Sequence, residues 1–275
     1  MSGEVMAWFL TLLAGLATGI GAACAFIVRQ PTPKLLSISL GFSAGVMLYV
    51  SLVEILPEAR TAISHAHPNA AAYAVGAFFA GIGIIAAIDA ALPEFSNPHE
   101  FHNTDQFLRP PGAQNQLFQA HPQAQAKLMR MGLFTAGALA LHNFPEGFAT
   151  FLSAIYDVKI AIPIAVAIAI HNIPEGIAVA MPIYYATGSR IRAFVWSFIS
   201  GLSEPIGALI GWLILRDMMS DTVFGLVFAA VAGIMVYISL DELLPSAEEF
   251  GQHHHAIGGL IAGMGVMAAS LLLLE

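Results

Sequence analysis

Apolar residues gather along this chain in long stretches that are separated by shorter polar segments. Each stretch supplies about the 20 residues that a helix needs to cross the roughly 30 Å hydrocarbon core of a bilayer. Water is absent from that core, so each stretch must satisfy its own backbone hydrogen bonds, which favours helices. The pattern predicts an all-α integral membrane protein with eight transmembrane helices, at 5–28, 35–57, 71–92, 131–153, 160–183, 192–215, 223–245 and 256–274.

One connection is much longer than the others. Residues 93–130 are rich in Pro, Gln, Asn and His, lack helical periodicity and are predicted to form a polar loop. Seven of the ten Lys and Arg residues flank the odd-numbered connections, which include this loop, and three flank the even-numbered ones. Because cytoplasmic loops carry an excess of basic residues, this bias predicts a cytoplasmic loop at 93–130 and extracytoplasmic termini.

The amino-acid composition agrees with a membrane protein and excludes several kinds of binding site. Hydrophobic residues make up 57% of the chain and charged residues 10%, whereas soluble domains have about 25% charged residues. The net charge of −8 excludes the basic surface of a nucleic-acid-binding protein. Cys24 is the only cysteine in the chain, which excludes an intrachain disulfide and a four-cysteine zinc site.

The chain contains inverted repeats. Residues 44–59 (AGVMLYVSLVEILPEA) and 232–247 (AGIMVYISLDELLPSA) are identical at ten of sixteen positions. The first three predicted helices match the last three, and the central two match each other through ALHNFPEGFA at 140–149 and AIHNIPEGIA at 169–178. Matching copies are an odd number of crossings apart, so they cross in opposite directions. Such repeats are typical of secondary transporters with a substrate site near the midplane, although membrane helices of similar composition also match by chance.

Acidic and imidazole side chains are predicted near the bilayer centre. His142 and His171 each precede a glutamate by four positions, Glu146 and Glu175, and Glu204 lies in the sixth predicted helix. One charged residue at the centre of a helix costs roughly 2.5 to 3.5 kcal/mol. No Lys or Arg lies in the middle of a predicted helix, so a cation from outside is the compensation that remains.

Helical spacing brings the polar residues of each motif onto one face, because residues three and four apart are neighbours. The candidate metal ligands are His142, Asn143, Glu146, His171, Asn172, Glu175 and Glu204. Nitrogen and oxygen ligands without thiolate suit Zn²⁺, Fe²⁺, Mn²⁺ and Co²⁺. The alternative is structural, since a single His, Asn or Glu in a membrane often only contacts a neighbouring helix. That alternative is strongest for Glu204, whose repeat partner is Thr18.

At the paired HNFPEG and HNIPEG motifs the sequence resembles the ZIP family of divalent-metal transporters, closely its bacterial branch. The resemblance covers the whole chain and implies one domain, 1–275, with its helices in a 3+2+3 inverted-repeat bundle. It implies zinc uptake across the bacterial cytoplasmic membrane, with iron, manganese, cobalt and cadmium as further substrates. No prosthetic group and no enzymatic activity are expected. The implied partners are the lipid bilayer and divalent metal ions, with a homodimer left open and no nucleic acid.

The resemblance also implies a binuclear site with helices that move in an elevator-like way. One metal would bind His142, Glu146, His171 and Glu175. The other would bind Asn143, Glu146, Asn172, Glu175 and Glu204, so that Glu146 and Glu175 bridge the two metals.

Other polar residues permit two interpretations. Glu54, Glu242 and Asp89 would line the entrance and exit of the metal pathway, or simply extend their charges into water at the membrane interface. The histidines at 99, 102, 121 and 253–255 would collect or sense released metal, or simply be solvated. A membrane metalloenzyme is the main rival function, because helical Glu and His also build di-iron sites. Such sites use Glu-x-x-His, and an intramembrane zinc protease would use His-Glu-x-x-His, whereas His precedes Glu by four residues in this chain.

Overall fold

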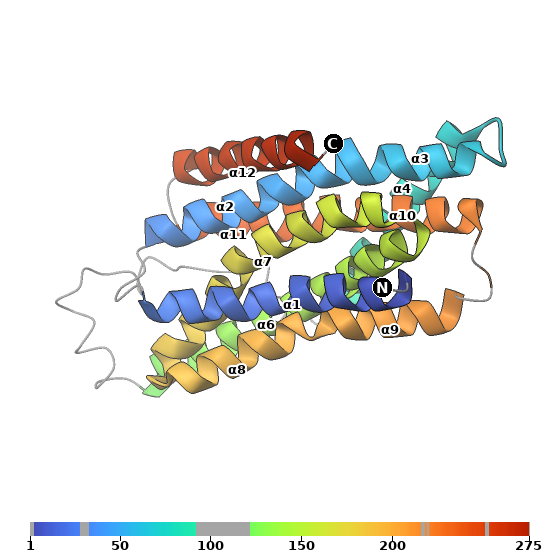
Figure 1. Ribbon diagram of the computed structural model, residues 1–275. Coiled ribbons are helices and arrows are strands. Elements are labelled where there is room, and N and C mark those ends of the chain that lie inside the picture. Colours follow the sequence, from blue (N-terminus) through green and yellow to red (C-terminus); the bar gives the residue numbers. More distant parts are fainter. Residues whose placement is uncertain are drawn as a thin grey trace.

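The computed structural model describes residues 3–27, 33–91, 122–215, 218, 220–250 and 253–274, and the regular elements among them are all helical. The elements are α1 (Gly3–Ile27), α2 (Pro33–Val50), α3 (Leu56–Ser64), α4 (Ala70–Ala91), α6 (Pro122–Tyr156), α7 (Val158–Thr187), α8 (Arg190–Gly201), α9 (Ser203–Leu215), α10 (Asp221–Ile238), α11 (Leu244–Phe250) and α12 (His253–Leu274), with π-helical turns η1 (Ser51–Ile55) and η4 (Ser239–Leu243). Successive helical segments run back and forth along one axis and form an elongated bundle (Figure 1).

Seven segments of the described chain are long and apolar enough to cross a membrane: Gly3–Ala23, Ser37–Ser64, Ala70–Ala90, Val158–Met181, Arg190–Ile214, Asp221–Glu248 and His253–Leu273. This finding confirms the prediction of an all-α integral membrane protein. The fourth predicted span lies within α6, several of whose side chains are outside the described ones. The membrane crossing of α6 therefore stays a prediction.

The long polar loop is shorter than the sequence predicts. Helix α6 begins at Pro122, so residues 122–130 are helical, and the rest of the predicted loop lies outside the described residues. Proline is well suited to the first position of a helix. The residues that follow it, QAQAKLMRM, are mostly strong helix formers, which explains a helix without an apolar face. The histidines at 99, 102 and 121 have no described placement.

The sixth predicted span is two helices and not one. α8 ends at Gly201 and α9 begins at Ser203, with Leu202 in a turn between them. Pro205 explains the interruption, because proline has no amide hydrogen to donate to the carbonyl four residues earlier. Ser203 Oγ instead donates to Ser200 O at 2.6 Å, next to the break. Glu204 consequently lies in the first turn of α9, at a helix N-terminus.

The second and seventh predicted spans continue past the prolines that were expected to end them. η1 and α3 extend α2 to Ser64, and η4 and α11 extend α10 to Phe250. In each π turn the bond reaches five residues back, from Leu56 N to Ser51 O and from Leu244 N to Ser239 O. The wider turn accommodates the proline at 57 or 245 within a helical path. The two turns begin at matching positions, Ser51 and Ser239, of the two similar sequence segments.

Close glycine contacts follow the same symmetry. A Cβ added at Gly21 on α1 would overlap Ile173 O on α7, and one at Gly207 on α9 would overlap Phe144 O on α6. Ile173 and Phe144 hold equivalent places in the two central motifs. Small residues of this kind let membrane helices approach until their backbones touch. α7 therefore packs closely against α1, and α6 packs closely against α9, at the level of the candidate ligands.

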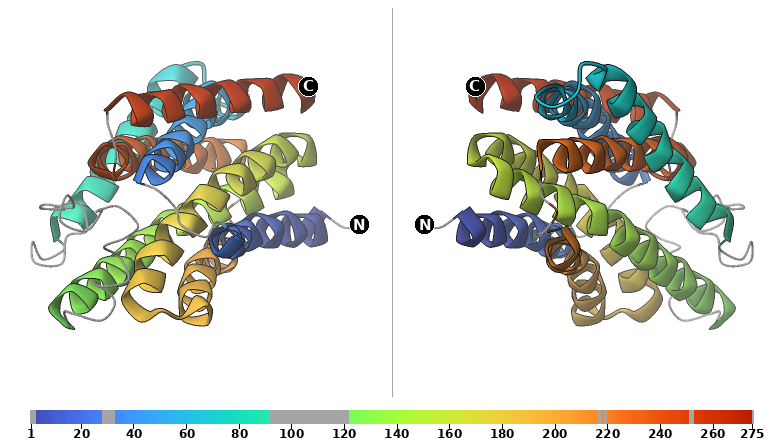
Figure 2. Two further views of the ribbon diagram at one scale, coloured as in Figure 1. Left: turned by 90° about the vertical axis from the view of Figure 1, so that its left-hand side faces the viewer. Right: turned by 90° about the vertical axis from the view of Figure 1, so that its right-hand side faces the viewer.

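The helices form two packed groups. α1, α6, α7, α8 and α9 contact one another, α2, α3, α4, α10, α11 and α12 contact one another, and α2 also packs on α7. Seen from its two ends, the bundle has α2, α10 and α12 on one side and α1, α8 and α9 on the other, with α6 and α7 between them (Figure 2). The candidate site lies in the group that contains α6 and α7.

Local signals fix the ends of α7, which carries half of the candidate ligands. Asp157 precedes the helix, and its carboxylate accepts a hydrogen bond from Lys159 N at 2.8 Å. Gly188 follows the helix with φ of 64°, a left-handed conformation that glycine adopts without steric cost. Ser189 then caps α8 by accepting from Arg192 N at 3.3 Å.

Candidate metal site

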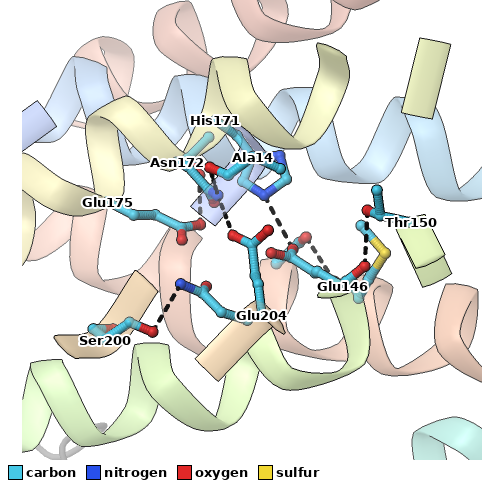
Figure 3. A network of polar contacts seen from close by, with 12 residues as sticks. Ala14, Glu146, Thr150, His171, Asn172, Glu175, Ser200 and Glu204 are labelled. Atoms are coloured by element: carbon cyan, nitrogen blue, oxygen red, sulfur yellow. Dashed lines mark hydrogen bonds and ion pairs between the residues drawn. The ribbon is translucent and has the colours of Figure 1, made fainter. Parts of the chain in front are cut away.

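Six of the seven predicted ligands meet in the interior of the bundle. Asn143 and Glu146 come from α6, three come from α7, and Glu204 comes from α9. All six side chains are completely buried, and the labelled ones among them project toward one another in Figure 3. His142 belongs to α6, but its side chain lies outside the described ones. The α7 members are His171, Asn172 and Glu175.

Glu146 and His171 join the two central helices. His171 Nε2 lies 3.0 Å from Glu146 Oε1, with both side chains fully buried. The backbone carbonyl of Glu146 accepts from Thr150 Oγ1 at 3.0 Å, one turn further along α6 (Figure 3). Buried polar groups of this kind are stable only when they are bonded to one another or to a ligand.

Glu204 is bonded to Asn172. Asn172 Nδ2 donates both to Glu204 Oε1 and, at 2.9 Å, to Ala14 O of α1. Glu204 also lies in the first turn of α9, and the N-terminal turn of a helix favours negative charge. The interruption at Leu202 therefore places Glu204 in the first turn of a helix in the interior of the bundle.

Glu175 has a donor on each carboxylate oxygen. Ser43 Oγ of α2 donates to Glu175 Oε1 at 3.0 Å. Asn143 Nδ2 donates to Glu175 Oε2 at 3.3 Å and to Leu139 O at 3.1 Å when its amide is turned to satisfy both of its polar atoms. In the opposite orientation Nδ2 reaches Ser200 O at 3.4 Å, but the amide oxygen then faces only acceptors. The turned orientation is therefore preferred.

These pairings leave the candidate ligands bonded to each other rather than arranged around one point. Among the side chains that the structure describes, which omit His142, no three His, Cys, Asp or Glu residues are grouped closely enough to hold a metal ion. Asn172 Oδ1 is buried and has no hydrogen-bond donor within the same described part. The site thus contains buried carboxylates at short range, with His, Asn and Ser side chains among their bonded partners.

Acidic side chains also gather at one end of the bundle. Asp221, at the start of α10, has its Oδ2 3.1 Å from Nδ1 of His65. Burial, and then the charge and hydrogen bonding of Asp221, raise the pKa of Tyr156, where α6 ends. Asp157 and Glu58 add further negative charge around this tyrosine. Three carboxylates therefore act on Tyr156 at the end of α6.

Comparison with known proteins decides the family. The family described as ZIP Zinc transporter matches residues 96–271. The zinc transporter ZupT of Chlorobaculum parvum is 57% identical over 276 residues, which cover 99% of each chain. The chain belongs to the ZIP family. The zinc transporter ZupT of Streptococcus mutans is 55% identical over 269 residues, or 97% of each chain, and that of Clostridium perfringens is 52% identical over 278 residues, or 99% of this chain and 97% of the relative.

Membership of the ZIP family answers the question of function class. ZIP proteins are membrane transporters and not enzymes, so the metalloenzyme interpretation is not needed. The relatives are bacterial, and together with the apolar helices they show that this ZIP protein is a multi-pass membrane protein.

Among the weaker candidates for the metal pathway, Glu54 lies in η1 and Glu242 in η4. His253 Nδ1 lies 2.6 Å from the exposed Glu248 Oε1.

Sequence reasoning did not identify Ser43 as a bonded neighbour of a candidate ligand. A lone serine in an apolar span is common and carries no charge, so its residue type gives no signal. The flanking glycines were a usable clue. Gly41 and Gly45 share one face of α2 and approach α12, which leaves Ser43 on the opposite face.

Proposed function

We propose that this protein carries zinc into the cytoplasm across the bacterial cytoplasmic membrane, and accepts iron, manganese, cobalt and cadmium as further divalent substrates. The single observation that carries the proposal is a set of three fully buried carboxylates, Glu146, Glu175 and Glu204, whose bonded partners include His171, Ser43 and Asn172. Anions in a low-dielectric interior favour a cation as ligand. Similarity to the bacterial zinc transporters supports zinc as that cation.

The proposed cation replaces the hydrogen bonds between the ligands. A metal between α6 and α7 would take the carboxylates of Glu146 and Glu175 together with imidazole nitrogens of His142 and His171. A second would take the same two carboxylates with Asn143, Asn172 and Glu204. The oxygen of Asn172 that has no donor among the described residues is suited to this role. Oxygen-rich sites without thiolate also favour release, because they bind zinc less tightly than cysteine sites.

The proposed frame is the 3+2+3 inverted-repeat bundle, in which α6 supplies the eighth crossing. Its support is the symmetric placement of η1 and η4 and of the glycine contacts on α6 and α7. Alternating access in such folds comes from movement of one packed group against the other. The group with α6 and α7 would then carry the metal past the group with α2 and α10.

The proposal predicts metal uptake by the purified protein alone. Proteoliposomes that contain it should accumulate radiolabelled zinc down a concentration gradient without any organic substrate. Excess Fe²⁺, Mn²⁺, Co²⁺ and Cd²⁺ should each reduce the zinc signal. Empty liposomes give the background rate. Vesicles that contain folded protein and admit zinc no faster than empty ones would contradict the proposed function.

The predicted orientation has its own test. With Cys24→Ala removing the native thiol, Glu4→Cys near the start of α1 and Lys34→Cys at the start of α2 each offer one exposed label site. We expect a membrane-impermeant maleimide to label position 4 in intact spheroplasts and position 34 only after lysis, because the basic flanks of the first connection favour the cytoplasm. The reverse pattern would show that the termini are cytoplasmic.

A further inference from the structure

Ser43 connects the candidate site to the other group of packed helices. Its Oγ donates to Glu175 Oε1 at 3.0 Å, and both side chains are completely buried. The backbone around it is fixed, since a Cβ at Gly41 or Gly45 would overlap Ala256 O or Leu260 O of α12. With that face of α2 against α12, the serine on the opposite face is directed at α7.

The contact has no counterpart in the inverted repeat. The residue 188 positions after Ser43 is Val231, which has no polar group to donate. Glu146, the counterpart of Glu175, has its Oε1 bonded to His171 instead. Both carboxylates that are proposed to bridge the metals thus have a partner on the other central helix, but only Glu175 is also bonded by a side chain of α2 in the part of the chain that the structure describes.

We propose that Ser43 is a positioning residue for Glu175, which rests on the proposed role of Glu175 as a metal ligand. A hydroxyl that bonds one carboxylate oxygen fixes the rotation of the carboxylate and directs the other lone pairs into the site. The hydroxyl is neutral, so the carboxylate keeps its charge for the cation. Groups that orient a metal ligand in this way typically contribute 10-fold to 100-fold in metal affinity or activity.

Kinetics of zinc uptake in proteoliposomes test the proposal. Ser43→Ala should raise the half-saturating zinc concentration about 10-fold, while the maximal rate changes by less than about twofold because ground-state binding is what is lost. Ser43→Thr keeps the hydroxyl and should restore most of the affinity. Ser37→Ala is the matched control, since Ser37 is also buried on α2 but its hydroxyl has no partner among the described residues. It should behave as the unmodified protein does.

A double substitution shows whether Ser43 acts through Glu175. In a Glu175→Asp background the carboxylate no longer reaches Ser43, so Ser43→Ala should add much less than 10-fold to the half-saturating concentration. Equal effects in both backgrounds would overturn the proposal. So would a lower maximal rate with unchanged half-saturation that Ser43→Thr does not correct, because that pattern indicates a packing role.

The outcomes separate this inference from the proposed function. If Glu175→Ala abolishes uptake and Ser43→Ala matches the unmodified protein, the positioning role is wrong and the metal site stands. If Glu175→Ala also transports normally, the metal site itself is wrong. Should Ser43→Ala not be recovered folded, Ser43→Cys has nearly the same size and a weaker donor, and it should show the raised half-saturating concentration.

Discussion

Replacing Glu146 or Glu175 with alanine is expected to reduce zinc uptake by more than about 100-fold, because each substitution removes a charged ligand and not merely the group that orients one. Both carboxylates are fully buried, and each is proposed to contact both metals. Glu146→Ala also removes the carboxylate that is bonded to His171. Glu175→Ala removes the carboxylate that accepts from the Ser43 hydroxyl. Initial rates of radiolabelled zinc uptake, divided by the amount of folded protein in the vesicles, measure the effect.

Glu4→Gln is the matched control for these variants. Glu4 is an exposed acid in the first turn of α1, so its replacement removes one negative charge far from the site. Its uptake rate should stay within about twofold of the unmodified protein, since exposed charges contribute little. Normal uptake by correctly inserted Glu146→Ala and Glu175→Ala proteins would show that the buried carboxylates do not bind the substrate.

Gly147→Leu is expected to have the largest effect on stability. A Cβ at Gly147 of α6 would overlap the backbone of Glu204, including its carbonyl oxygen, at the start of α9. The side chain has to push apart two helices whose contact also places a candidate ligand. Overpacking of this kind costs about 3 kcal/mol, and zinc uptake should fall with stability because Glu204 is displaced.

The comparison needs a glycine on the same helix with free space around it. Gly137 of α6 has nothing within 4 Å of an added Cβ and is exposed, so Gly137→Leu should unfold at nearly the same temperature as the unmodified protein. Thermal unfolding in detergent, followed by loss of monodisperse protein, ranks the variants. Equal midpoints for the two leucine variants would mean that α6 and α9 do not pack as described.

The sequence was a good guide where one physical rule dominates. Burial in lipid determines the helical spans, and the three and four residue spacing places Asn143 with Glu146 and Asn172 with Glu175 on shared faces. The sequence was a poor guide to helix ends, because these depend on local backbone geometry. Proline signalled an end at 57 and at 245, but a π turn absorbs each one, whereas Pro205 does interrupt its helix.

Contacts between distant segments were also beyond the sequence pattern. Ser43 and Glu175 are 132 residues apart, and their hydrogen bond depends on how α2 packs between α12 and α7. Hydropathy reports only that both helices are apolar. The helical start of α6 was missed because its residues have high helix propensity but no apolar face. Without an apolar face the sequence shows no hydrophobic periodicity, which is the pattern that predicts a helix.

The matching π turns bear on the history of the chain. Such turns are rare, and each amounts to one residue more than an α-helix would hold over the same path. η1 and η4 begin at Ser51 and Ser239, at the same register of the two copies. One ancestral insertion that was already present before the gene segment duplicated accounts for both more simply than two independent insertions do. The widened turn would then be older than the chain that contains both copies.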